Sequence, residues 1–419
     1  MDYKIFAPDK IEMEVDLPAS KSISNRMLIL NALCGGELHN VARCDDTDAM
    51  RRALATDTTA SGAVATVNIG AAGTAMRFLT AYLCTQEGTH EITGTARMRQ
   101  RPIGVLVDAL RSLGAQIDYV ENEGFPPLRI KGGELAGGKL ELPAGVSSQY
   151  VSALLMIGPT LANGLQLRLV GEIVSRPYIE MTLHIMRHFG AKAQWTADDC
   201  IQVEPGGYHP IPYYIESDWS ASSYWYEMVA LTGDDKAEVV LPGLFSHSLQ
   251  GDCAIRQLFD QLGVSTTFLT DEEGVESVCL RKSGQPVTRM EYDFTHQPDL
   301  AQTLVATCAA LGIPFRFQGL QSLKIKETDR MAALRTELGK LGFDIMEHDG
   351  SMLTWDGHRR TVDNPLPADT YEDHRMAMAL APLALKEGML RMNDPGVVSK
   401  SYPTFWDHLQ QVGFKIEAS

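Results

Sequence analysis

The sequence predicts an α/β protein that is built from a repeated unit and divided into two domains. One pattern recurs five times: apolar residues at helical spacing, then a glycine, then an alternating apolar run typical of a strand. Intervals of 76, 73, 79 and 71 residues separate the five glycines, Gly114, Gly190, Gly263, Gly342 and Gly413. A weaker copy without the terminal glycine begins at Asp45. Because six units of about 70 residues account for the 419 residues, we expect a sixfold α/β repeat.

The two predicted domains meet at polar, turn-forming stretches of the chain. A chain of 419 residues is too long for one ordinary hydrophobic core. The candidate crossing points are Pro18–Ser20 and Glu216–Asp218. We therefore expect residues 20–216 to carry the first three repeats, and residues 1–19 with 217–419 to carry the last three.

Composition and charge argue against several classes of protein. The formal net charge is −16 at pH 7, whereas a nucleic-acid partner requires a basic patch. The first 18 residues alternate as a strand does rather than forming a signal peptide, and no apolar run approaches the ~20 residues of a membrane span. We therefore expect a cytoplasmic protein without a membrane or nucleic-acid partner.

Cysteine and histidine positions predict neither disulfides nor a metal site. The seven cysteines are scattered and form no C-x-x-C pair, which indicates buried thiols in a reducing compartment. His184 and His188 are four residues apart, a spacing that can place two metal ligands on one helix face. No third ligand is nearby in the sequence, so we interpret both histidines as structural and expect no metal.

Residues suited to anions recur at predicted helix starts. Ser20 is a good N-cap for a helix that ends at Gly35, which places Lys21 and Ser22 in its first turn and Arg26 on the same face. Other helix starts of the first half carry Gly73 and Thr74 after a glycine-rich turn, Arg101 before Pro102 at position N1, and the trio Ser147, Ser148 and Gln149.

The second half repeats this arrangement with acidic neighbours. Lys326 and Arg330 are predicted to share a helix face at i,i+4, with Glu327 beside them. Asp299 precedes the predicted helix 300–310, and further cations are Arg375, next to His374, and Lys400. For each isolated segment a structural interpretation stays open, in which Glu327 only pairs with Arg330 and Asp299 only caps a helix.

The cations together predict an anion-binding protein. Seven of them stand at predicted helix mouths: Lys21, Arg26, Arg101, Lys326, Arg330, Arg375 and Lys400. Two phosphorylated carboxylate substrates bring about five to six negative charges, which this set can balance.

Seven segments, in order along the chain, resemble the 5-enolpyruvylshikimate-3-phosphate synthase family. They are LPASKSISNR, GAAGTAMR, RMRQRPIG, SSQYVSALL, SRPYI, KIKETDRMA and DHRMAMALA. The resemblance implies a two-domain inside-out α/β barrel with six βαβαββ units, three per domain, and helices inside. It further implies an enzyme without a cofactor that transfers the enolpyruvyl group of phosphoenolpyruvate to the 5-hydroxyl of shikimate 3-phosphate by addition and elimination. Independently of the resemblance, we expect a monomer.

The resemblance also implies roles for individual residues. Shikimate 3-phosphate would contact Lys21, Ser22, Arg26, Ser147, Ser148, Gln149, Ser175, Asp299, Ser322 and Lys326. Phosphoenolpyruvate would contact Lys21, Gly73, Thr74, Arg101, Gln149, Arg330, Arg375 and Lys400. Asp299 would accept the hydroxyl proton, Glu327 would protonate and later deprotonate the methylene carbon, Lys21 would stabilise charge, and His374 would help to position Glu327 or the phosphate.

Departures from the family pattern fall near the predicted phosphoenolpyruvate residues. Ala71 replaces a usual Asn, Phe78 stands where Pro is frequent, and Ser322 stands where Asn is common. Gly73 is expected to leave room for the inhibitor glyphosate, although Phe78 on the same helix could shift it.

Two alternative functions stay open. A UDP-N-acetylglucosamine enolpyruvyl transferase would carry a Cys where this chain has Ala96. An inactive anion-binding scaffold would tolerate loss of Asp299 or Glu327, yet both are present.

Overall fold

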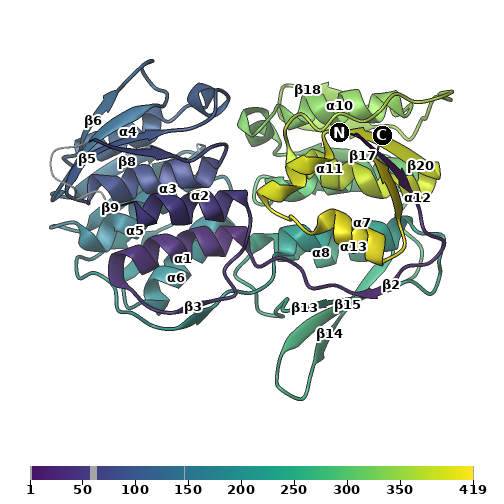
Figure 1. Cartoon of the computed structure of the whole chain (residues 1–419), viewed down its shortest axis with the longest axis horizontal. Helices are drawn as coiled ribbons and strands as arrows, with labels where there is room; N and C mark the ends of the chain where they lie inside the picture. The colour runs from purple at the N-terminus through teal and green to yellow at the C-terminus, as the bar shows by residue number, and fades with distance from the viewer. Residues whose placement is uncertain (1, 57–63, 146, 419) are drawn as a thin grey trace. The chain divides into compact units, whose positions relative to one another are not determined.

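The computed structural model describes residues 2–56, 64–145 and 147–418 (Figure 1). The chain divides into two compact units: unit 1 comprises Met1–Pro18 and Glu216–Ser419, and unit 2 comprises Ala19–Ile215. These limits differ by one residue from the expected domain boundaries. The expected domain boundaries themselves stay a prediction.

Unit 2 has a core of three helices: α1 (Lys21–Cys34), α3 (Gly73–Cys84) and α5 (Ser148–Ile157). Helix α3 packs against both α1 and α5, and every residue of α5 except Gln149 is buried. A helix that is apolar around its whole circumference belongs in a core, which explains this position. Three further helices complete the unit: α2 (Asp45–Ala55), α4 (Gly104–Ser112) and α6 (Arg176–His188).

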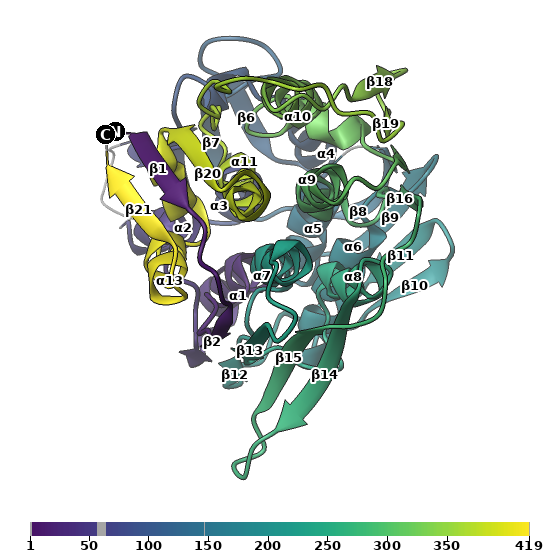
Figure 2. The same cartoon turned by 90° about the vertical axis from the view of Figure 1, so that its right-hand side faces the viewer.

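Unit 1 repeats this arrangement with α7 (Trp219–Leu231), α9 (Ala301–Leu311) and α11 (His374–Leu380) in its core. All residues of α7 except Ser220 are buried, and α9 packs against both α7 and α11. Figure 2 looks along these helices and shows strands of three sheets around them. The remaining helices are α8 (Ile255–Asp260), α10 (Arg330–Lys340), α12 (Ala384–Glu387) and α13 (Phe405–Gln411).

Four sheets share one topology, in which a parallel pair of strands continues into two antiparallel pairings. In unit 2 they are β4 (Ala65–Asn68), β5 (Gly88–Thr93), β7 (Leu128–Gly132) and β6 (Gln116–Tyr119), and then β8 (Gly138–Pro143), β9 (Leu165–Val170), β11 (Cys200–Val203) and β10 (Ala193–Ala197). In unit 1 they are β2 (Glu12–Glu14), β13 (Glu238–Pro242), β15 (Glu276–Lys282) and β14 (Val264–Thr270), and then β16 (Met290–Asp293), β17 (Phe315–Gln318), β19 (Met352–Trp355) and β18 (Met346–His348).

The other two sheets are reduced versions of this unit. In unit 2, β3 (Leu38–His39) pairs in parallel with β12 (Tyr213–Tyr214). In unit 1, β1 (Asp2–Phe6) lies between β20 (Met389–Asn393) and β21 (Lys415–Ala418), antiparallel to both. With three sheets around three buried helices in each unit, the predicted sixfold repeat and the inside-out α/β fold are confirmed.

The repeat glycines have the conformation that the sequence predicts. Gly114, Gly190, Gly263, Gly342 and Gly413 follow α4, α6, α8, α10 and α13, with φ angles of 105°, 85°, 80°, 93° and 109°. Side chains with a Cβ rarely adopt such angles, so glycine is the natural residue to end each helix and turn the chain into a strand.

Two local predictions were wrong. Pro102 is not at position N1, because Met98–Gln100 (η1) forms its own 3₁₀ turn and α4 begins only at Gly104. Lys326 and Arg330 do not share a helix face, because Asp329 caps α10 and Lys326 precedes it in extended backbone after the 3₁₀ helix Gln321–Ile325 (η5).

The cysteines are less uniformly buried than predicted. All seven are free thiols, but Cys34, Cys200 and Cys253 are only partly buried. In residues 2–56, 64–145 and 147–418, each helix is too short or too polar to span a bilayer. The same ranges contain no cluster of three or more His, Cys, Asp or Glu side chains placed to hold a metal ion.

Candidate active site

The first group of predicted residues in unit 2 lies at the start of α1. The Ser20 hydroxyl accepts a hydrogen bond from the Ile23 backbone at 3.4 Å, which confirms the predicted cap. Lys21 occupies the first position of the helix, and its Nζ lies 3.2 Å from Oδ2 of the buried Asp46. Asp46 belongs to an acidic first turn of α2, and the sequence analysis did not identify it as a partner of Lys21.

Arg26 is buried beneath this helix start among neutral oxygens. Its guanidinium donates to the Thr182 hydroxyl at 2.7 Å, the Ser152 hydroxyl at 3.0 Å and the Ser22 carbonyl at 2.8 Å. The Phe78 ring lies under the guanidinium at 5.3 Å, so this departure from the family pattern packs against a predicted substrate residue. Burial lowers the pKa of Arg26 to about 10, because the charged guanidinium is removed from water. An anion bound beside it would stabilise this buried charge.

A second group in unit 2 brings together Gly73, Thr74, Arg101 and Gln149. Gln149 Nε2 donates to the Thr74 hydroxyl at 3.1 Å, which joins the starts of α5 and α3. A Cβ on Gly73 would lie 2.6 Å from Nη1 of Arg101. Arg101 therefore packs directly on the first residue of α3, although the sequence placed it at the start of the next helix.

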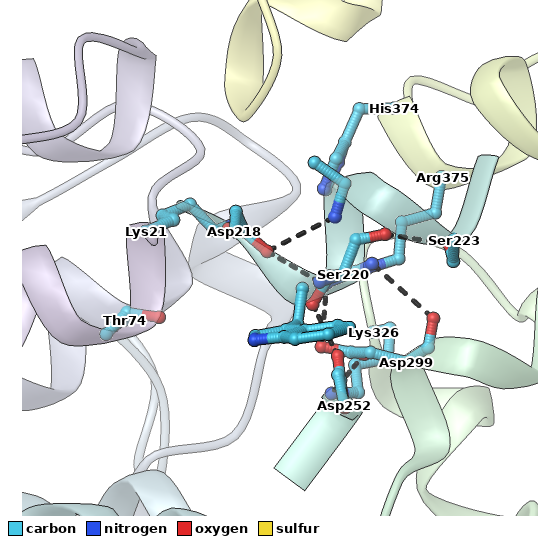
Figure 3. A network of polar contacts seen from close by, with 12 residues as sticks. Lys21, Thr74, Asp218, Ser220, Ser223, Asp252, Asp299, Lys326, His374 and Arg375 are labelled. Carbon is cyan, nitrogen blue, oxygen red and sulfur yellow. Dashed lines mark hydrogen bonds and ion pairs between the residues drawn. The ribbon is translucent and has the colours of Figure 1, made fainter. Parts of the chain in front are cut away.

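Unit 1 contains a cluster of carboxylates and cations around Asp299, shown in part in Figure 3. Asp299 lies in the 3₁₀ turn Pro298–Leu300 (η4) that leads into α9. Its carboxylate is 3.4 Å from Lys326 Nζ, 3.1 Å from Arg330 Nη1 and 3.0 Å from Arg375 Nη2. Three cations therefore surround this one carboxylate.

The second predicted acid/base residue, Glu327, shares a partner with Asp299. Its two oxygens lie 2.9 Å from Arg330 Nη2 and 2.7 Å from Lys400 Nζ, where Lys400 ends the 3₁₀ helix Pro395–Lys400 (η7). The structure therefore unites the predicted residues Asp299, Lys326, Glu327, Arg330, Arg375 and Lys400 in one cluster.

Sequence analysis missed the counter-ion of Arg330. Asp373 is fully buried, accepts from Arg330 Nε at 2.7 Å and Nη2 at 3.2 Å, and caps α11. Burial lowers the pKa of Arg330, but the carboxylates of Asp373, Glu327 and Asp299 outweigh it and leave this pKa above its ordinary value. In the sequence, the one feature that could have indicated this role is the position of Asp373 directly before His374 and Arg375.

Asp252 is a further missed carboxylate of unit 1. It is buried in the 3₁₀ helix Gly251–Ala254 (η3), accepts a hydrogen bond from the Ser220 hydroxyl, and belongs to the same network as Asp299 in Figure 3. Burial and the charge of Asp299 raise the pKa of Asp252. Burial also lowers the pKa of Lys326, although Asp299 opposes this effect.

The remaining predicted residues lie at element starts. Ser147 caps α5, accepting from the Gln149 backbone at 3.3 Å, and Ser148 is the first residue of that helix. Ser175 precedes α6 in left-handed backbone with φ 55°, and Ser322 lies in η5. His374 is buried with its Nδ1 3.6 Å from Asp373 Oδ1, so it adjoins the counter-ion of Arg330.

This chain is similar in sequence to known proteins along its whole length. The family model described as EPSP synthase (3-phosphoshikimate 1-carboxyvinyltransferase) matches residues 5–409. A 3-phosphoshikimate 1-carboxyvinyltransferase of Bacteroides fragilis is 55% identical over 419 residues, covering 100% of this chain and 99% of the relative. One of Cellvibrio japonicus is 38% identical, covering 95% of this chain and 96% of the relative.

Solved structures show the same fold. EPSP synthase of Acinetobacter baumannii matches with a TM-score of 0.78 at 22% identity, covering 100% of this chain and 99% of that one. An enolpyruvyl transferase of Streptomyces tendae matches with a TM-score of 0.70 at 15% identity, covering 100% and 98%. From its full-length sequence relatives and the matching family model, the chain belongs to the EPSP synthase (3-phosphoshikimate 1-carboxyvinyltransferase) family.

Proposed function

We propose how the residues grouped above divide the reaction of this family, which this chain catalyses. That reaction transfers the enolpyruvyl group of phosphoenolpyruvate to shikimate 3-phosphate in the shikimate pathway, and it releases phosphate. Shikimate 3-phosphate is bound by Lys21, Ser22, Arg26, Ser147, Ser148, Gln149, Ser175, Asp299, Ser322 and Lys326. Phosphoenolpyruvate is bound by Lys21, Gly73, Thr74, Arg101, Gln149, Arg330, Arg375 and Lys400.

Asp299 and Glu327 move the protons in this proposal. Asp299 takes the proton of the 5-hydroxyl of shikimate 3-phosphate as the hydroxyl oxygen attacks C2 of phosphoenolpyruvate. Glu327 protonates the methylene carbon of phosphoenolpyruvate in the same step. Glu327 then removes a proton from the resulting methyl group as the C–O bond to phosphate breaks. Lys21 stabilises the charge of the substrates. His374, which adjoins Asp373 beside Arg330, helps to position Glu327 or the phosphate.

The observation that carries the proposal is that one guanidinium contacts both acid/base candidates. Arg330 lies 3.1 Å from Asp299 and 2.9 Å from Glu327, while Arg375 holds the first carboxylate and Lys400 the second. These three cations are the phosphoenolpyruvate ligands that unit 1 contributes. An arriving phosphoenolpyruvate therefore competes with both carboxylates for the same cations, which releases Asp299 and Glu327 to act on the substrates.

Phosphate release from purified protein tests the reaction and its acceptor. We expect release from phosphoenolpyruvate with shikimate 3-phosphate and no release with UDP-N-acetylglucosamine. Phosphate release with UDP-N-acetylglucosamine alone would identify this compound, and not shikimate 3-phosphate, as the acceptor. No release with either compound, despite binding, would favour an inactive anion-binding scaffold.

Two variants test the acid/base roles against a closely matched control. Asp299→Asn and Glu327→Gln should each lower kcat by at least about a hundredfold. Glu347 is the control for Glu327: it lies 2.6 Å from Lys324 and 3.0 Å from Arg335, and its side chain is 16% exposed against 14% for Glu327. Glu347→Gln should retain kcat within about twofold. Glu347 is paired with two cations, as Glu327 is, but these cations are not among the proposed substrate ligands. Equal losses in Glu327→Gln and Glu347→Gln would contradict a chemical role for Glu327.

Glyphosate binding, a monomeric state and a cytoplasmic location also belong to the proposal. A Cβ at Gly73 would lie 2.6 Å from Arg101 Nη1, so the absence of a side chain at this position supports access of glyphosate to this cation. An inhibition curve that stays flat into the millimolar range would contradict it. Light scattering tests the monomer, and cell fractionation tests the location.

A further inference from the structure

The backbone just before α11 is strained at two consecutive residues. Tyr371 and Glu372 have φ angles of 56° and 54°, and among the described residues they are the one adjacent pair of non-glycine residues with positive φ. Most other such residues are Asn or Asp, which tolerate this region, whereas Tyr and Glu do not. Because strained backbone persists only where its surroundings hold it, the neighbours of Tyr371 indicate what the strain achieves.

A buried carboxylate of α10 holds this segment. Glu337 Oε1 accepts from the Tyr371 hydroxyl at 2.5 Å, and its Oε2 accepts from the Asp369 backbone at 2.9 Å. Lys340 Nζ is 2.7 Å from both Glu337 Oε2 and Asp369 Oδ2, so it balances the buried charge. On the other side, the Asn393 side chain donates to Asp369 Oδ1 at 2.6 Å.

The same helix contacts the segment again at its first residue. Arg330 begins α10 and donates to Asp373, while Glu337 lies seven residues later, about 10 Å along the helix. Asp373 in turn accepts from the Arg375 backbone at 3.0 Å. The two ends of α10 therefore bracket residues 369–373, which lead directly into His374 and Arg375.

We propose that Tyr371 and Glu337 are positioning residues, which hold the strained segment 369–373 so that Asp373 and Arg375 are presented correctly to Arg330 and to phosphoenolpyruvate. The inference rests on the proposed function for its substrate. Tyr371 is 36% exposed, so its hydroxyl can be removed without opening a cavity in the core.

Tyr371→Phe tests this clamp, the hold of Tyr371 and Glu337 on residues 369–373, by comparing the KM values of the two substrates. We expect KM for phosphoenolpyruvate to rise about five- to tenfold, which corresponds to the net contribution of one ordinary hydrogen bond, while KM for shikimate 3-phosphate changes less than about twofold. The matched control is Tyr226→Phe, which removes a buried hydroxyl 2.8 Å from Thr266 on β14 and should change neither KM. Phosphoenolpyruvate KM unchanged in Tyr371→Phe, or both KM values raised equally, would overturn the proposal.

Two further measurements separate positioning from general damage. Glu372 is the exposed neighbour of Tyr371, and glycine adopts its φ of 54° without strain. Adding Glu372→Gly to Tyr371→Phe should therefore lower KM for phosphoenolpyruvate again, at least in part. Hydrogen exchange of the ligand-free protein should show the amides of residues 369–376 exchanging about five- to tenfold faster in Tyr371→Phe. Absence of rescue, or unchanged exchange, would count against the clamp. If the unaltered protein released no phosphate, the proposed function would fail, and the exchange measurement would still decide on the clamp.

Discussion

Replacing Asp373 by Asn removes the charge that balances Arg330 and leaves the side-chain shape nearly unchanged. Asp373 is fully buried and lies 2.7 Å from Arg330 Nε. An amide NH₂ cannot accept from the guanidinium, although the remaining oxygen can still cap α11. Removing one partner of a buried ion pair typically costs 3–5 kcal/mol. Because Arg330 keeps Asp299 and Glu327 as partners, we expect a loss of about 3 kcal/mol in the free energy of unfolding.

Asp344→Asn is the matched control for this change. Its Oδ2 lies 2.8 Å from Nε of Arg360, but the side chains of Arg360 and Asp344 are 51% and 52% exposed. Exposed ion pairs contribute about 0–1 kcal/mol, so this variant should lose at most about 1 kcal/mol. The two substitutions share their chemistry and the donor atom of the pair, and they differ in burial.

Urea unfolding followed by tryptophan fluorescence measures both losses. Four of the five tryptophans, Trp219, Trp225, Trp355 and Trp406, are in unit 1 with both pairs. Asp373→Asn should also raise KM for phosphoenolpyruvate by more than about tenfold, because Arg330 is then differently placed. Equal unfolding losses in the two variants, within about 0.5 kcal/mol, would refute the idea that burial decides the strength of these pairs.

Three further changes have distinct expected outcomes. Burial holds the pKa of Glu227 well above its usual range, so above about pH 4.5 the unfolded chain loses a proton that the folded chain keeps, which costs up to about 1.4 kcal/mol per pH unit. Glu227→Gln should therefore raise the melting temperature more at pH 8 than at pH 5, and an equal shift at both would contradict this. Because the pKa of Lys326 is lowered by burial, shikimate 3-phosphate binding measured by calorimetry should weaken at a lower pH than free lysine titrates, and Lys326→Arg should remove this dependence. Gly73→Ala places a methyl 2.6 Å from Arg101 Nη1 and should raise KM for phosphoenolpyruvate about tenfold while leaving that for shikimate 3-phosphate unchanged; no change in either would show that Arg101 yields freely.

Features that depend on a few neighbouring residues were predictable from the sequence. The Ser20 cap of α1 and the glycine after each repeat helix follow from hydrogen bonding and backbone sterics within about one helical turn. The spacing of those five glycines, together with the weaker copy at Asp45, was enough to predict the sixfold repeat. The same local reasoning failed at Arg101 and at Lys326, because competing 3₁₀ turns moved the helix starts by a few residues.

Partnerships between distant residues were decided only by the tertiary structure. Asp299 meets Arg330 and Arg375 across separations of 31 and 76 residues, and Arg330 meets Asp373 across 43. The sequence determined which residues carry charge and how often the unit repeats. Which carboxylate neutralises which cation depends on how buried helices pack, and the energy of each pair depends on the water that packing excludes, a property that no single segment of chain contains.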